Sequence, residues 1–151
     1  MKTFLQPLQN LAEMEEIQKQ AKKNRGILEI SGCMESQKAH LMYGLSGLFP
    51  SHLVIAADEK TAKDLYEDYR FYDKRVYYYP AKDLLFFQAD IHGNLLIRQR
   101  MQVIRALLER QEEITVVTSI DGCMDYLLPL EKIEKQLIHF RNDSSLDMDK
   151  L

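Results

Sequence analysis

Apolar residues near the start of the chain recur with the period of an α-helix. Polar and charged residues separate them from residue 3 to residue 24, which predicts an amphipathic helix. Such a helix is expected to cover one face of a sheet. Pro7 falls in the first turn, where proline is tolerated, and the Asn-Arg-Gly sequence at 24–26 predicts the helix end. The apolar positions are Leu5, Leu8, Leu11, Met14 and Ile17.

Further along, short continuous apolar runs predict strands that are buried in a parallel sheet. Helical patterns separate these runs, so we expect right-handed crossovers and a three-layer α/β fold with a mostly parallel sheet of about five strands. The whole of 1–151 is expected to form one domain, with a helix in 1–25 packing on it and a following domain starting in 142–151. The predicted strands cover 27–30, 52–57, 75–79, 114–118 and 136–140, and the helices 36–48, 59–72, 94–111 and 121–129.

The first predicted strand leads into a stretch with the layout of a phosphate loop. In the motif G-x-x-x-x-G-K-[ST], a strand is followed by a turn whose Lys opens a helix. Gly32 and Lys38 stand at the spacing of the motif. The second Gly of the motif is replaced by Gln37 and the closing Ser or Thr by Ala39.

These replacements remove features of the loop that bind the phosphates and the Mg²⁺ ion of a nucleotide. Glycine lets a phosphate approach the backbone N–H groups, whereas Gln37 places a side chain there. Glu35 adds a negative charge, and Ala39 lacks the hydroxyl that normally holds Mg²⁺. Lys38 and the helix N-terminus remain as a general anion site. Two interpretations stay open: a phosphate loop in shape but not in activity, or an ordinary strand-turn-helix with a chance Gly and Lys.

Composition and charge argue against several classes of protein. The chain has 151 residues and a net charge of -3, which argues against a basic nucleic-acid-binding domain. No apolar run approaches the roughly 20 residues of a membrane span, and no secretory signal is predicted. Cys33 and Cys123 lie far apart and suit a reducing cytoplasm, where Cys33 is expected to be a small hydrophobe. Thr118-Ser119 follows a predicted strand where an acidic pair would bind a metal, so we expect no metal site.

Two other groups of residues are weak candidates for contact with a partner or DNA. Phe86 and Phe87 fall in a long segment, 81–93, which we expect either to pack down or to meet a partner. Arg98, Arg100 and Arg105 could touch a phosphate backbone, but a solvated helix face with local ion pairs is the favoured interpretation.

Several segments, taken in order, resemble the N-terminal region of bacterial transcription-repair coupling factor. That region is similar to the first helicase-like domain of the B component of excinuclease, and the resemblance covers nearly the whole chain. The excinuclease relative keeps both loop glycines and the Thr, whereas this chain has Glu35, Gln37 and Ala39, which favours the coupling factor. The segments are 36–39, 53–72, 79–86, 98–100 with the following helix, and 114–119.

The resemblance implies a degenerate P-loop NTPase-like (helicase-like) domain without catalytic residues or a cofactor of its own. Gly32, Ser36 and Lys38 are then vestigial, and the domain is a scaffold and autoinhibitory module packed against other domains of a cytoplasmic parent. ATP and Mg²⁺ would belong to a downstream DNA translocase motor, which the chain lacks. The parent would contact duplex DNA, stalled RNA polymerase and the A component of excinuclease, while the fragment alone would bind DNA weakly and no membrane.

Two alternatives remain. One is the nucleotide-binding first half of a helicase that is similar to the B component of excinuclease. It would require Lys38 and the helix N-terminus to hold phosphates without the loop glycines. The other is a small DNA- or protein-binding module that uses the arginines and phenylalanines named above.

Overall fold

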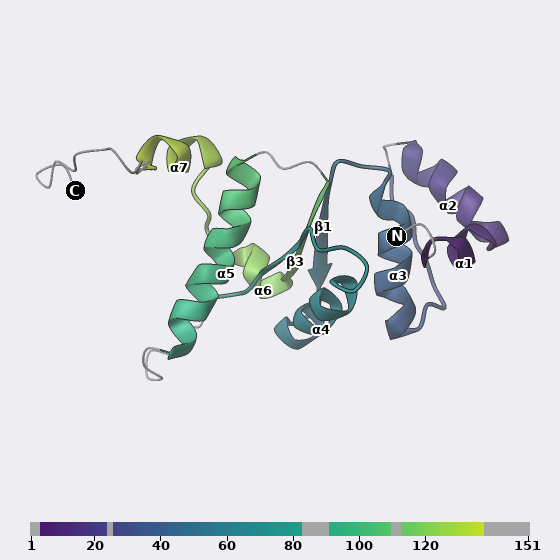
Figure 1. The fold of residues 1–151 in the computed structure, drawn as a ribbon, viewed down its shortest axis with the longest axis horizontal. Coiled ribbons are helices and arrows are strands. Elements are labelled where there is room, and N and C mark those ends of the chain that lie inside the picture. Colours follow the sequence, from purple (N-terminus) through teal and green to yellow (C-terminus); the bar gives the residue numbers. More distant parts are fainter. Residues whose placement is uncertain (1–3, 24–25, 83–90, 110–112, 138–151) are drawn as a thin grey trace, which may run out of the picture.

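The computed structural model, which describes residues 4–23, 26–82, 91–109 and 113–137, shows an α/β fold (Figure 1). Its sheet has three parallel strands in the order β1-β3-β2. They are β1 (Ser51–Ala56), β2 (Val76–Tyr79) and β3 (Ile114–Ser119). The central strand, β3, pairs on both sides, and all six of its residues are buried. This burial explains why its sequence is a continuous apolar run.

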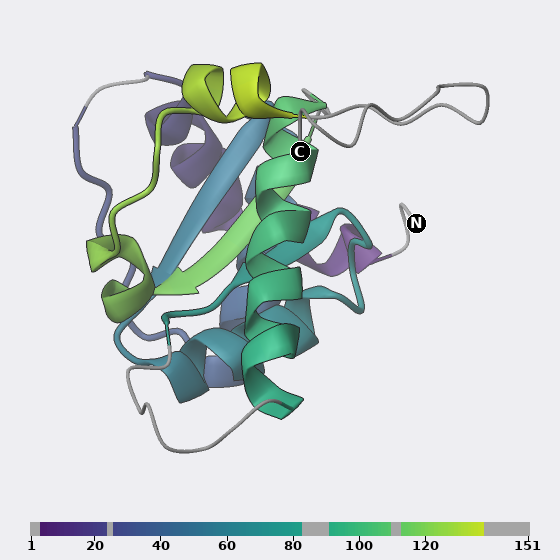
Figure 2. The same ribbon diagram turned by 90° about the vertical axis from the view of Figure 1, so that its left-hand side faces the viewer.

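Helices lie on both faces of the sheet. α3 (Glu35–Ser46) and α4 (Glu59–Tyr69) enclose one core with the sheet, in which Ala39, Tyr69 and Val117 are almost completely buried. α5 (Ile91–Leu108) covers the other face, over a second core that includes Val103 and Val116 (Figure 2). The α/β class, the parallel sheet and the flanking helices predicted from the sequence are therefore confirmed.

The strand predicted at 27–30 is wrong. The segment is irregular and unpaired, and Ile27 is completely exposed, while Leu28 and Ile30 are 43% and 38% exposed. An apolar β-forming run becomes a strand only when it finds a neighbour to pair with, which is a non-local condition. The described part of the chain therefore has three strands instead of about five.

The helix predicted over 3–24 is divided, and it does not cover the sheet. α1 (Gln6–Gln9) and α2 (Ala12–Lys22) are separated at Asn10–Leu11. Their buried residues, Leu8 and Met14, press against Gly44 of α3: a Cβ built on Gly44 would lie 2.7 Å from Leu8 Cδ1 and 2.9 Å from Met14 Cε. The pair packs on the outside of α3 because the glycine permits this close approach.

The apolar spacing within 94–111 places Ile97, Met101, Ile104 and Leu108 on one face of the predicted helix. In α5, Ile104 of this face is buried as predicted, together with Val103, whereas Ile97 and Met101 are 61% and 49% exposed. The helix begins at Ile91, three residues earlier than expected. None of the described helices is long and apolar enough to cross a membrane.

The C-terminal region departs from the expectation in its helices. α6 (Ile120–Met124) occupies only the start of the helix predicted at 121–129. Pro129 immediately precedes an additional helix, α7 (Leu130–Gln136), which packs on α5. The strand predicted at 136–140 is not formed at Gln136, which ends α7; its residues 138–140, and the segment 142–151, lie outside the described residues.

His52 makes the stability of the fold depend on pH. Its side chain is half-buried in β1, its Nε2 has no hydrogen-bond partner among the described residues, and burial lowers its pKa below the ordinary value of 6.5. Between pH 6.5 and the lower pKa of the folded state, the unfolded chain therefore binds a proton that the folded chain does not. Lowering the pH through this window decreases the free energy of unfolding.

We expect the melting temperature to fall between pH 7.5 and pH 5.5, and to fall less in His52→Leu. The leucine keeps an apolar side chain beside Phe49 but cannot titrate. Scanning calorimetry at the two pH values measures the loss of melting temperature in each protein. The contributions of the other titrating groups are common to both proteins and cancel when the two losses are subtracted. Equal losses in the two proteins would contradict a role for His52.

Candidate functional site

The carboxyl ends of the strands meet the starts of three helices at one edge of the sheet. In open α/β sheets this edge is where ligands usually bind. A crevice of about 600 Å³ opens there beside the end of β1 and the starts of α3 and α4, and its lining continues along α4 to Asp68. Its charged lining includes two cations and three carboxylates, a balance that does not favour a polyphosphate. These residues are Lys38, Lys60, Glu35, Asp64 and Asp68.

The altered loop keeps one geometrical feature of a phosphate loop. Gly32 has φ +80°, a left-handed conformation that favours glycine, although a Cβ there would meet no atom within 4 Å. Cys33 beside it is a free, half-buried thiol. The segment before Gly32 is not a strand, so the loop lacks the strand that would hold it rigidly against the sheet.

Gln37 occupies the helix start that a phosphate would need. Its side-chain Oε1 accepts a hydrogen bond from the backbone N–H of Met34 at 3.1 Å, and its own N–H donates to the Met34 carbonyl at 2.9 Å. These are among the first donors of the helix, which otherwise remain unpaired and attract anions. The protein therefore caps this helix with its own side chain.

Lys38 and Ala39 are also committed to the protein. Lys38 Nζ lies 2.5 Å from Glu35 Oε1, an ion pair on one helical turn. Such an exposed pair contributes little to stability, but it places a carboxylate where a phosphate would bind. Ala39 is completely buried in the core, so the position that holds a Mg²⁺-binding hydroxyl in the motif faces apolar side chains instead. Ser36 lies exposed on the same turn.

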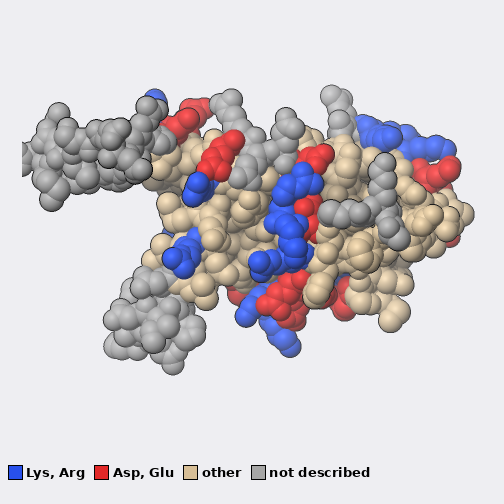
Figure 3. All heavy atoms as spheres, in the orientation of Figure 1, with Lys and Arg blue, Asp and Glu red and all other residues tan. Residues whose placement is uncertain are grey.

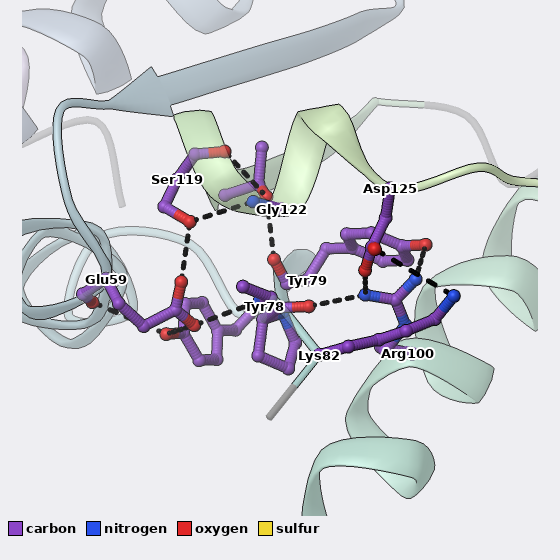
Figure 4. A network of polar contacts seen from close by, with 11 residues as sticks. Glu59, Tyr78, Tyr79, Lys82, Arg100, Ser119, Gly122 and Asp125 are labelled. Carbon is purple, nitrogen blue, oxygen red and sulfur yellow. Dashed lines mark hydrogen bonds and ion pairs between the residues drawn. The ribbon is translucent and has the colours of Figure 1, made fainter. Parts of the chain in front are cut away.

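A second arrangement at this edge is centred on Glu59, the first residue of α4 (Figure 4). Its Oε2 accepts a hydrogen bond from Ser119 Oγ at 2.6 Å, at the end of β3. Its Oε1 accepts from the Tyr78 hydroxyl and from the Ala81 backbone N–H, at the end of β2. Burial and the nearby carboxylate raise the pKa of Tyr78, because both disfavour a phenolate.

Arg100 closes the other side of this network. It donates to Asp125 Oδ2 at 2.7 Å, to the Pro80 carbonyl at 2.8 Å and to the Tyr79 hydroxyl at 2.5 Å, and its guanidinium lies 4.2 Å from the Tyr79 ring centre (Figure 4). Only 11% of its side chain is exposed. Arg100 is therefore a structural cation that joins α5 to the ends of β2 and α6.

The structure separates the three arginines that the sequence placed together. Arg98 is exposed on α5, and Arg105 is exposed and pairs with Glu109 at 2.6 Å, whereas Arg100 is engaged inside the protein. They do not form a common phosphate-binding surface. Phe86 and Phe87 lie outside the described residues, so their predicted contact role stays a prediction.

Sequence reasoning missed the network around Glu59. Ser119 stood out only because it replaces an acidic residue after a buried strand, and the sequence pattern did not single out Glu59. The glycine at position 122, just after the strand, is a weak sequence signal of close packing. In the structure a Cβ there would collide with Thr118 Oγ1, whose hydroxyl donates to the Tyr79 carbonyl at 2.7 Å. No group of three or more His, Cys, Asp or Glu side chains among the described residues could hold a metal ion.

Comparison with known proteins identifies no relative. No protein-family model, no curated protein and no solved structure matches this chain.

We expect Arg100→Ala to lower the free energy of unfolding by about 3 kcal/mol, because Asp125 loses its buried cation and keeps only the longer contact of 3.8 Å with the exposed Lys82. Arg98→Ala on the same helix is the matched control and should change stability by less than about 0.5 kcal/mol, as exposed substitutions usually do. Urea denaturation measures both. Equal effects of the two substitutions would contradict the structural role of Arg100.

Proposed function

We propose that this chain is a non-catalytic, degenerate helicase-like domain that serves as a scaffold and autoinhibitory module in a transcription-repair coupling factor. The parent protein would use ATP in a separate motor to move along DNA, displace stalled RNA polymerase and recruit excision repair. Support for this family comes from the ordered sequence resemblance, and support for the silent site comes from the geometry of the altered loop.

One observation carries the silent part of the proposal: the three positions at the start of α3 that would serve a phosphate are used within the chain. Gln37 caps the start of α3, Lys38 pairs with Glu35, and Ala39 is buried. A bound nucleotide would have to break these contacts and enter a crevice with more carboxylates than cations.

Exposed apolar side chains support a role in packing against other domains. Leu53 and Ile55 of β1 are 63% and 53% exposed on the part of the sheet that α5 leaves uncovered. Leu53 also lines an apolar groove of about 420 Å³ together with Val103 and Leu107. Clustered apolar exposure of this kind marks interaction surfaces. In the proposed parent, neighbouring domains cover this face.

The alternative is a working nucleotide-binding half of a helicase similar to the B component of excinuclease. Gly32 with its left-handed backbone and the retained Lys38 favour it. It requires the Lys38–Glu35 pair to open when a nucleotide arrives.

Titration with Mg-ATP separates the two. We expect no calorimetric heat and no change in melting temperature at about 1 mM Mg-ATP. For a site with a micromolar Kd, this ligand concentration is about 1,000 times the Kd. Binding would then stabilise the fold by about 4 kcal/mol and raise the melting temperature by roughly 10 °C. Stabilisation that disappears in Lys38→Ala would overturn the silent site.

Family membership needs its own test. Sequencing the gene beyond the codon for Leu151 should show a helicase motor in the same reading frame. A reading frame that continues into an unrelated domain would contradict the coupling factor without affecting the conclusion about the loop.

A further inference from the structure

A groove of about 410 Å³ follows the free edge of β2, between α4 and α5. Its volume is within the range of ligand-binding sites. Val76, Tyr77 and Tyr78 line it along the strand, Tyr66 lines it from α4 and Ala106 from α5. The groove is separate from the altered loop, and nothing in the proposed function uses it.

The backbone of β2 presents hydrogen-bonding groups to this groove. In a parallel ladder, the N–H and C=O of one residue point to the same neighbouring strand, and alternate residues point to opposite sides. The Arg75 carbonyl accepts from the Thr115 N–H of β3, so Tyr77 faces β3 as well, while Val76 and Tyr78 face the free edge. Within the described part of the chain, no strand pairs with the backbone groups of Val76 and Tyr78.

These backbone groups are costly to leave unpaired. Val76 and Tyr78 are only 4% and 7% exposed, and buried N–H and C=O groups in proteins are nearly always paired. An added strand would supply both donors and acceptors at the correct spacing. No proline or bulge interrupts Val76–Tyr79, and Pro80, the next residue on this side, lacks an N–H and limits the open edge to Val76 and Tyr78.

The rim of the groove is predominantly positive. Arg70 and Lys74 are exposed and form no ion pair among the described residues, and Arg105 completes a set of three cations against the single acid Glu109. On one face of the molecule, Lys and Arg atoms form a central band with Asp and Glu atoms beside it and at its ends (Figure 3). A segment that binds here meets net positive charge although the whole chain is acidic.

We propose that this groove binds an acidic peptide segment of a partner protein in extended conformation, which adds to β2 as a new edge strand. Main-chain hydrogen bonds to Val76 and Tyr78 supply affinity, and the cations at Arg70 and Lys74 select for carboxylates. This mode of recognition is strand addition, with specificity from charge.

A peptide fits this groove better than a nucleic acid does. The floor offers N–H donors and C=O acceptors in alternation, which complement another backbone, whereas a phosphate chain offers only acceptors. Three cations beside a carboxylate are also few for a nucleic-acid interface, which typically neutralises many phosphates.

The test uses a fluorescein-labelled peptide, Ser-Glu-Val-Glu-Val-Glu-Ser with blocked ends, and fluorescence anisotropy with the full chain. We expect binding that weakens with salt and that falls at least tenfold in the double variant Arg70→Glu/Lys74→Glu. The control is Lys63→Glu, which reverses one exposed charge on α4 as each of the two substitutions does. Lys63 does not line the groove, so this variant should bind the peptide like the unmodified chain. Both altered positions are exposed, and circular dichroism checks that the variants fold.

Strand addition is tested by blocking the peptide backbone. One peptide is N-methylated at the valines and another at the glutamates. Alternate residues of a strand point their N–H groups to opposite sides, so we expect at least one of the two peptides to lose binding. The Val76 and Tyr78 amides should exchange more slowly with solvent when the unmodified peptide is bound. Absence of peptide binding, insensitivity to both methylation patterns or to the charge reversal, or tighter binding of an oligo-dT strand would overturn the proposal.

Discussion

The carboxylate of Glu59 is the interaction on which the arrangement of this fold most depends. One side chain at the start of α4 accepts hydrogen bonds from Ser119 at the end of β3 and from Tyr78 and Ala81 at the end of β2. An acid also suits the positive end of a helix, so the helix and both strands are held by the same charge. The neighbouring Arg100–Asp125 pair then ties α5 and the end of α6 to this edge.

This cross-linking matters because the sheet is small. Among the described residues the sheet has three strands and only β3 pairs on both sides, so β1 and β2 are both edges there. A sheet of this size obtains its stability from the helices packed on its faces and from contacts at the strand ends. At the ends of β2 and β3, the edge where ligands bind in similar architectures is therefore filled with internal hydrogen bonds, and the crevice at this edge lies beside β1.

Local patterns predicted a large part of the fold. The apolar runs at 52–57, 75–79 and 114–118 and the helical spacing between them gave three strands and their helices, because burial on both faces leaves a clear signature. The same reasoning failed at Ile27–Ile30, where β propensity is not matched by a pairing partner, and at Ile97 and Met101, which are apolar yet exposed. Pairing and packing depend on residues distant in sequence.

The candidate site shows the same division. From the sequence, Glu35, Gln37 and Ala39 could be recognised as departures from a phosphate loop, but only the structure shows each of them used within the chain. Arg100 looked equivalent to Arg98 and Arg105, yet its surroundings give it a different role, since charge in a sequence does not reveal burial. A helix start that is capped internally and a strand edge whose backbone is open favour recognition of protein over nucleotide.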